Sequence, residues 1–102
     1  MSKQISEILS ERKSNYGEYY QVASITESIK DALKQGASFK DLTPSQLLAL
    51  DMIANKLARV VNGDVTYTDS WQDIAGYALL VVKELEKKQY SFTLKRVAQV
   101  TA

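Results

Sequence analysis

The sequence contains no cysteine and no histidine. The absence of cysteine excludes disulfide bonds, a thiolate metal site and a cysteine nucleophile. The absence of histidine removes the usual general base, the commonest zinc ligand and every serine–histidine triad.

A large excess of one charge is also missing. Lysine and arginine number 13 and aspartate and glutamate number 12, so the formal net charge is +1. No global field draws such a protein to nucleic acid, and no predicted helix carries a basic stripe. We therefore expect no DNA binding, and any bound anion must be held by a local cluster of cations.

Long hydrophobic runs are absent as well. The longest apolar stretch without a charge covers residues 74–82, far short of the roughly 20 residues that span a bilayer. The first residues do not resemble a signal peptide. These features predict a cytoplasmic protein with no membrane partner. The length and the apolar fraction of 45% are those of a single globular domain.

Hydrophobic periodicity predicts an all-α fold, a small bundle of about four helices. Asparagine and glycine near residues 14–17, 36 and 62–64 mark the breaks between helices. The expected helices cover residues 2–13, 18–35, 44–62 and 69–88.

The third predicted helix has the clearest start signal. Thr43 is a capping residue, Pro44 stands at the first helical position and Gln46 follows three residues after the cap. Apolar residues then recur at steps of three and four, which indicates a buried face on each helix. The predicted core residues are Val22, Ile25, Ile29, Ala32 and Leu33 on the second helix, Leu47, Leu50, Ala54, Leu57 and Val61 on the third, and Trp71, Ile74, Ala75, Ala78, Val82 and Leu85 on the fourth.

The last residues form a separate segment in this prediction, with a helical domain over 1–88 and a tail over 89–102. Residues 91–94 alternate like a strand, whereas residues 94–100 are also compatible with a helix. A lone strand needs a partner, so the tail is a candidate for docking on another copy of the chain.

Charged and polar residues lie beside the apolar faces of the third and fourth helices. A short loop joins these helices, so they should pack antiparallel and bring the two sets together. The arrangement fits a structural network of ion pairs, and it also fits a ligand site. The residues are Asn55, Lys56 and Arg59 on the third helix and Asp69, Asp73 and Tyr77 on the fourth.

A second candidate cluster covers residues 11–20. It holds Arg12, Lys13 and the tyrosines at 16, 19 and 20 around a helix break. Arginine with exposed tyrosine can hold a phosphate and stack a base. Tyrosines packed into the core and cations on a solvated face would produce the same sequence.

These motifs resemble an uncharacterised family of small proteins from bacteriophages and prophages over roughly residues 7–86. More distantly, the layout is similar to the all-α nucleoside triphosphate pyrophosphohydrolases of the MazG type. The residues that carry the resemblance are Arg12, Tyr16-Gly17, Ala23, Ala49-Leu50-Asp51-Met52-Ile53, Lys56-Leu57-Ala58-Arg59, Gly63-Asp64, Asp69-Ser70-Trp71 and Asp73-Ile74-Ala75-Gly76-Tyr77.

The resemblance to MazG-type proteins implies a homo-oligomeric helical bundle that binds nucleotides and holds magnesium with acidic helix residues. Their Glu-Glu-x-x-Glu motif has no match in this chain. Asp69 and Asp73 take the place of their Glu-x-x-Asp motif, with altered spacing. Magnesium can manage with one or two protein carboxylates when phosphate oxygens supply other ligands.

Three functions follow as hypotheses. The first is a binder of a phosphorylated small molecule or nucleotide, which in a phage protein would sequester a host nucleotide signal in the host cytoplasm. The second is a magnesium-dependent nucleoside triphosphate pyrophosphohydrolase, with Asp69 and Asp73 on the metal. The third is a protein-interaction inhibitor of a host complex. The ligand-binding candidates are Arg12, Tyr16, Asn55, Lys56, Arg59 and Tyr77.

Overall fold

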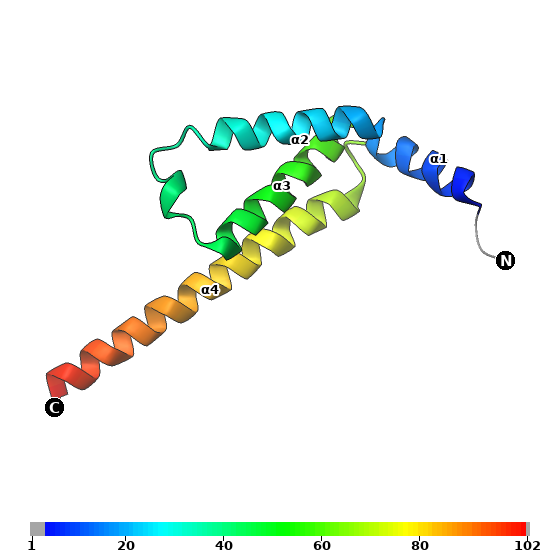
Figure 1. Cartoon of the computed structure of the whole chain (residues 1–102). Helices are drawn as coiled ribbons and strands as arrows, with labels where there is room; N and C mark the ends of the chain where they lie inside the picture. Colours follow the sequence, from blue (N-terminus) through cyan, green and yellow to red (C-terminus); the bar gives the residue numbers. More distant parts are fainter. Residues whose placement is uncertain (1–3, 102) are drawn as a thin grey trace.

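The computed structural model describes the backbone of residues 4–101 and the side chains of residues 4–88. This part of the chain forms four α-helices and one short 3-10 helix and contains no strand, which confirms the all-α prediction (Figure 1). The elements are α1 (Ile5–Tyr16), α2 (Tyr19–Leu33), η1 (Phe39–Asp41), α3 (Pro44–Asn62) and α4 (Thr68–Thr101).

Helix α3 is the centre of the fold. The two large interfaces are those of α3 with α2 and of α3 with α4, while α1 makes smaller contacts with α2 and α3. Helices α2 and α3 form a hairpin closed by η1, and α4 runs back beside α3 and continues well past it (Figure 1). The backbone of α4 is helical to Thr101, so the tail adopts the helical alternative and not the strand.

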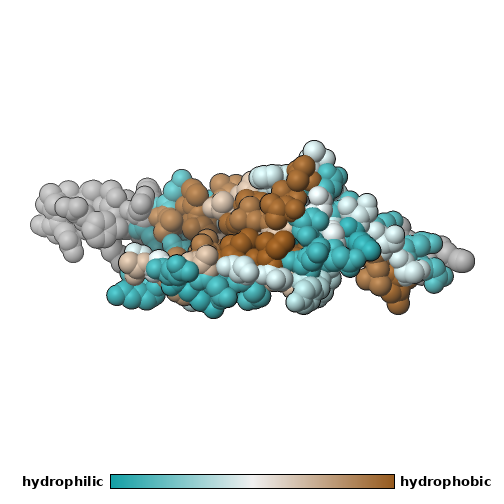
Figure 2. All heavy atoms as spheres, turned by 90° about the horizontal axis from the view of Figure 1, so that it is seen from above, coloured by the Kyte–Doolittle hydropathy of each residue, from teal (hydrophilic) through white to brown (hydrophobic). Residues whose placement is uncertain are grey.

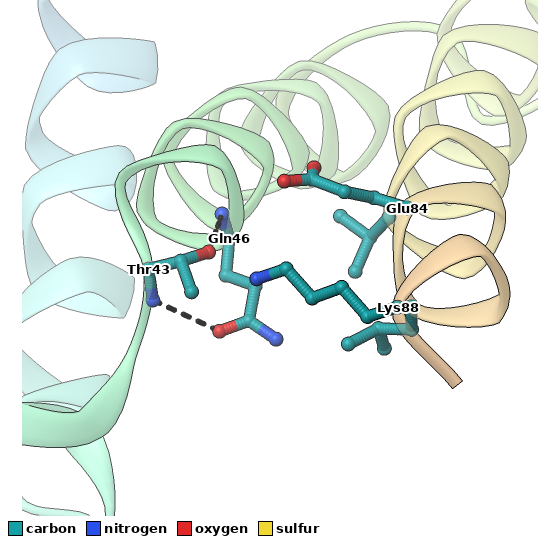
Figure 3. A pocket seen from close by; sticks show the side chains of 6 residues that line it. Thr43, Gln46, Glu84 and Lys88 are labelled. Atoms are coloured by element: carbon teal, nitrogen blue, oxygen red, sulfur yellow. Dashed lines mark hydrogen bonds between the residues drawn. The ribbon is translucent and has the colours of Figure 1, made fainter. Parts of the chain in front are cut away.

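The start of α3 is fixed by the capping box predicted from the sequence. The Gln46 backbone N–H donates to Thr43 Oγ1 at 3.2 Å, and the Thr43 N–H donates to Gln46 Oε1 at 3.0 Å (Figure 3). Glu84 and Lys88 of α4 line a hollow beside this cap. Its volume of about 10 Å³ has room for about one water, so it is too small for a ligand.

The core is made of small side chains. No large side chain in the described part of the chain is fully buried, and the buried apolar residues are Val22, Ala49, Ala54, Ala58 and Val60. Of the predicted core residues, only Val22 and Ala54 are buried to this extent. Alanines on α3 let the neighbouring helices approach closely, but they contribute little apolar area each.

The prediction of a buried face on α4 is wrong for the single chain. Trp71, Val82 and Leu85 are 50%, 44% and 41% exposed, and Ala75 and Ala78 are exposed as well. Ser70 is the one buried residue of α4 within the described side chains. Within the described residues, no helix is long and apolar enough to cross a membrane.

Candidate functional site

The break between α1 and α2 is locked against the end of α3. Gly63 lies so close to α1 that a Cβ atom there would collide with backbone atoms of Asn15 and Tyr16. The Asp64 N–H donates to the carbonyl oxygen of Asn15 at 2.9 Å. Gly17, which ends α1, has a φ of +81°, a value that favours glycine.

A side chain completes this contact. Asn62 Nδ2 donates to the carbonyl oxygens of Tyr16 at 3.1 Å and Glu18 at 3.4 Å. Tyr16 is the last residue of α1 and Glu18 is the N-cap of α2, so Asn62 ties the end of one helix to the start of the next. We call Asn15–Gly17 together with 62–64 the α1–α3 clamp.

The α1–α3 clamp places the Tyr16 ring near cations from two helices. The guanidinium carbons of Arg59 and Arg12 lie 4.6 Å and 5.9 Å from the ring centre, within the range of cation–π attraction. The Tyr67 ring meets Tyr16 edge to face, with 5.7 Å between the centres. In the described residues no carboxylate forms an ion pair with either guanidinium.

Tyr67 connects this aromatic cluster to α4. Its hydroxyl donates to Asp69 Oδ2 at 3.1 Å. That hydrogen bond, with the neighbouring Tyr16 hydroxyl and the charge of Asp69, raises the pKa of Tyr67 to about 12. Tyr67 was not among the site residues predicted from the sequence. Its position in the short loop between Arg59 and Asp69 could have indicated that it contacts both helices.

A cavity of about 340 Å³ opens beside Tyr16 at the α1–α2 junction. Arg12, Lys13 and the exposed ring of Tyr19 line it together with Tyr16. Lys13 pairs with Glu18 at 2.7 Å, and this hydrogen bond raises the pKa of Lys13. The volume falls within the range of small-molecule sites. The second predicted cluster therefore brings Arg12 and Tyr16 together beside an accessible hollow.

The polar residues predicted on α3 reach three different helices. Asn55 Nδ2 donates to Thr26 Oγ1 of α2 at 3.4 Å. Lys56 Nζ pairs with Asp73 Oδ2 of α4 at 3.1 Å. Arg59 contacts α1 instead. The site predicted between α3 and α4 is therefore divided, and only Arg59 of the three joins Arg12 and Tyr16.

The Lys56–Asp73 pair has one covered and one open end. The Lys56 side chain is 13% exposed and that of Asp73 is 49% exposed. Asp73 also lines an open hollow on α4 with Gly76 and Tyr77. Lys56 is thus occupied by its ion pair, whereas the outer edge of Asp73 faces solvent.

The two acids predicted to hold magnesium have other partners in this structure. Asp69 accepts from Tyr67, and Asp73 is paired with Lys56. No group of three acidic side chains suited to a metal ion occurs among the described residues. These donors do not form a metal site by themselves, and magnesium binding stays a prediction.

Comparison with known protein families identifies one family whose model matches this chain. The model of a domain of unknown function, DUF6378, matches residues 1–85. The chain belongs to this family. The match includes all the residues of the α1–α3 clamp and the aromatic cluster, so these features lie within the family's domain. No curated protein and no solved structure matches the chain.

Proposed function

We propose that this DUF6378 protein binds a phosphorylated small molecule that carries an aromatic ring, a nucleotide, in the cavity at the α1–α2 junction. One observation carries the proposal. Arg12 and Arg59 lie against the same tyrosine ring beside an open cavity, and no acidic side chain in the described part of the chain pairs with either.

The cations suit a phosphate. A guanidinium presents five N–H donors in a fork that matches phosphate oxygens. Contact with the Tyr16 ring uses none of the oxygen acceptors that compete with a ligand, so the N–H donors of a guanidinium stay available for a phosphate. Arg12 lines the cavity directly, whereas Arg59 lies against Tyr16 outside the lining. We therefore assign phosphate contact to Arg12 and orientation of Tyr16 to Arg59.

The aromatic residues suit a base. Tyr19 lines the cavity and is 86% exposed, so its ring has open area for stacking. Base–aromatic stacking contributes about 1–3 kcal/mol per base. The clamp fixes the direction in which α2 starts, and so it fixes Tyr19 relative to Arg12. A nucleotide would thus meet a cation and a stacking surface from opposite sides of one helix break.

Calorimetric titration of the full chain with a panel of ligands tests the proposal. The panel holds nucleoside mono-, di- and triphosphates, cyclic dinucleotides, unphosphorylated nucleosides and inorganic phosphate. We expect binding of a phosphorylated nucleoside, with nucleosides much weaker. Arg12→Ala should weaken it roughly 10- to 100-fold, as loss of a charge-assisted hydrogen bond does. Tyr19→Ala should reduce the preference for nucleotide over inorganic phosphate.

Lys34→Ala is the matched control, because Lys34 lies at the far end of α2 in an exposed pair with Asp31. Its affinity should equal that of the unchanged protein. Absence of heat across the whole panel would remove the proposal. Binding that survives Arg12→Ala unchanged would place the ligand elsewhere.

The same preparation separates the other hypotheses. Pyrophosphate release from a nucleoside triphosphate with magnesium would make the protein an enzyme and bring Asp69 and Asp73 into the reaction. Capture of a host complex, with the panel silent, would favour an interaction inhibitor. Sequestration of a host nucleotide signal in a phage-infected cell follows from the proposal only if a signalling nucleotide binds.

A further inference from the structure

Helix α4 carries an apolar stripe that the rest of the chain leaves uncovered. Its members recur at steps of four, three, four and three, the spacing of a coiled-coil seam. All five are exposed, although such a seam normally faces another helix. The stripe consists of Trp71, Ala75, Ala78, Val82 and Leu85.

An apolar groove runs beside this stripe, between α3 and α4. Its volume is about 300 Å³, and no charged side chain lines it. The lining residues are Leu42, Gln46, Ala49, Leu50, Ile53, Ala78 and Val81. Ala78 belongs to both the groove and the stripe, so the two form one continuous surface, the α3–α4 face. Figure 2 shows hydrophobic residues gathered in a broad area across the middle of the molecule.

The accessible surface of the chain is larger than that of a compact monomer of the same mass. Its accessible surface is 7927 Å², whereas a folded monomer of 11.4 kDa exposes about 5,800 Å². Its radius of gyration is 19.1 Å, against about 13 Å for a compact domain of this length. The excess is roughly 2,000 Å² per chain and includes the surface of α4 where this helix continues past α3 (Figure 1). Obligate dimers bury about 1,000–2,500 Å² per partner, so the excess is large enough to include such an interface.

We propose that a second copy of the chain covers the α3–α4 face with its own α3–α4 face, across a twofold axis. The result is a four-helix core made of α3 and α4 from each copy. In a single chain α3 packs on α2 and on α4, so the three helices form one layer. Stable domains are built from at least two packed layers, and the second copy supplies the second layer.

The chemistry of the face favours a second copy over another protein. Without charged residues in its lining, the groove presents no like-charge repulsion when two identical faces meet. An exposed stripe and a groove lie side by side, so a twofold rotation sets each stripe toward the partner's groove.

Sedimentation equilibrium of the full chain and two arginine variants tests this arrangement. Val82→Arg places a charge in the stripe. Leu80→Arg is the control, because Leu80 is 63% exposed on the same helix but about 200° away from Val82 around its axis. We expect twice the chain mass for the unchanged protein and for Leu80→Arg, and at least a hundredfold weaker association for Val82→Arg.

The single tryptophan supplies a second readout that needs no variant. Trp71 belongs to the stripe and is 50% exposed in one chain. Its fluorescence should be that of a buried indole at high protein concentration and shift to longer wavelength on dilution, along the same curve as the mass. This measurement remains informative if Val82→Arg unfolds.

A cysteine variant adds a test within the folded protein, because the natural chain has no cysteine. Ala78→Cys should form a covalent dimer with a short thiol cross-linker, whereas Lys83→Cys on the far side of α4 should not. A single-chain mass with full helical content at every concentration would overturn the proposal. So would an oligomer that Leu80→Arg dissociates and Val82→Arg leaves intact.

Nucleotide binding and dimerisation are distinguishable. The cavity lies at the α1–α2 junction, and none of its lining residues belongs to the α3–α4 face. Arg12→Ala should therefore leave the dimer mass unchanged.

Discussion

Arg59 of α3 places its guanidinium carbon 4.6 Å from the centre of the Tyr16 ring at the end of α1. This contact joins two helices that are far apart in the sequence. Asn62, which lies about one turn after Arg59 on α3, donates a hydrogen bond to the carbonyl oxygen of Tyr16. The side chain and the backbone of Tyr16 are therefore held separately by the same helix.

The Arg59–Tyr16 contact should contribute measurably to stability. A cation–π contact contributes about 0.5–1 kcal/mol when exposed and about 2 kcal/mol when desolvated. Because Arg59 is partly buried, we expect Arg59→Ala to lower the free energy of unfolding by about 1 kcal/mol, with Arg59→Lys in between. Urea unfolding at one protein concentration measures this, since association also contributes. Lys34→Ala should have no effect, and an equal loss in both alanine variants would contradict the assignment.

Local signals explain what the sequence predicts well. Thr43, Pro44 and Gln46 are close neighbours, so their capping box follows from the sequence and is confirmed. The predicted approach of Lys56 to Asp73 rests on a short loop that leaves two helices little choice of arrangement. In both cases the partners are near in sequence or tied by a short connection.

Contacts between distant segments explain what the sequence does not predict. Asn62 and Gly63 were interpreted only as a helix end, because nothing local shows that Tyr16 lies against them. The stripe on α4 was assigned to the core because periodicity shows which face is apolar and not what covers it. Asn55 shares a face with Arg59, but α2 meets the face at Asn55 and α1 meets it at Arg59.

Two glycines should respond in opposite ways to alanine. A Cβ at Gly63 would collide with the backbone of α1, which cannot give way as a flexible side chain can. We expect Gly63→Ala to cost about 2–3 kcal/mol, as overpacking does. Gly76 lies within α4 with nothing within 4 Å of such an atom, so Gly76→Ala should stabilise the protein by about 1 kcal/mol.

Thermal unfolding followed by circular dichroism compares the two variants, and each serves as the control for the other. Gly63→Ala should also reduce nucleotide binding, because the clamp orients the α1–α2 junction. Equal melting temperatures for the two variants would show that the close approach of α1 and α3 is not maintained in solution.

Removal of either partner of the Lys56–Asp73 pair should have unequal effects. Asp73→Asn leaves the ammonium group of a side chain only 13% exposed without a counter-ion, which is costly. Lys56→Met keeps the apolar length of the side chain and leaves Asp73, half exposed, in water. We expect Asp73→Asn to be the more destabilising, by about 1–2 kcal/mol. Chemical unfolding of both variants checks the order, and the reverse order would mean that the pair opens in solution.

The bond between Tyr67 and Asp69 predicts a pH dependence at high pH. The pKa of Tyr67 is raised from 10.0 to about 12, so its stabilising effect is complete below pH 10 and is lost as the pH rises through about 12. Asp69→Asn should lower the pKa of Tyr67 toward 10.0, because it removes the carboxylate that accepts the hydrogen bond. Ultraviolet absorbance of tyrosinate follows the titration. Tyr67→Phe should remove the step at highest pH, whereas Tyr20→Phe, on an exposed part of α2, should leave that step in place. If the step stays near 12 in Asp69→Asn, then Asp69 is not the acceptor that holds Tyr67 beside Tyr16.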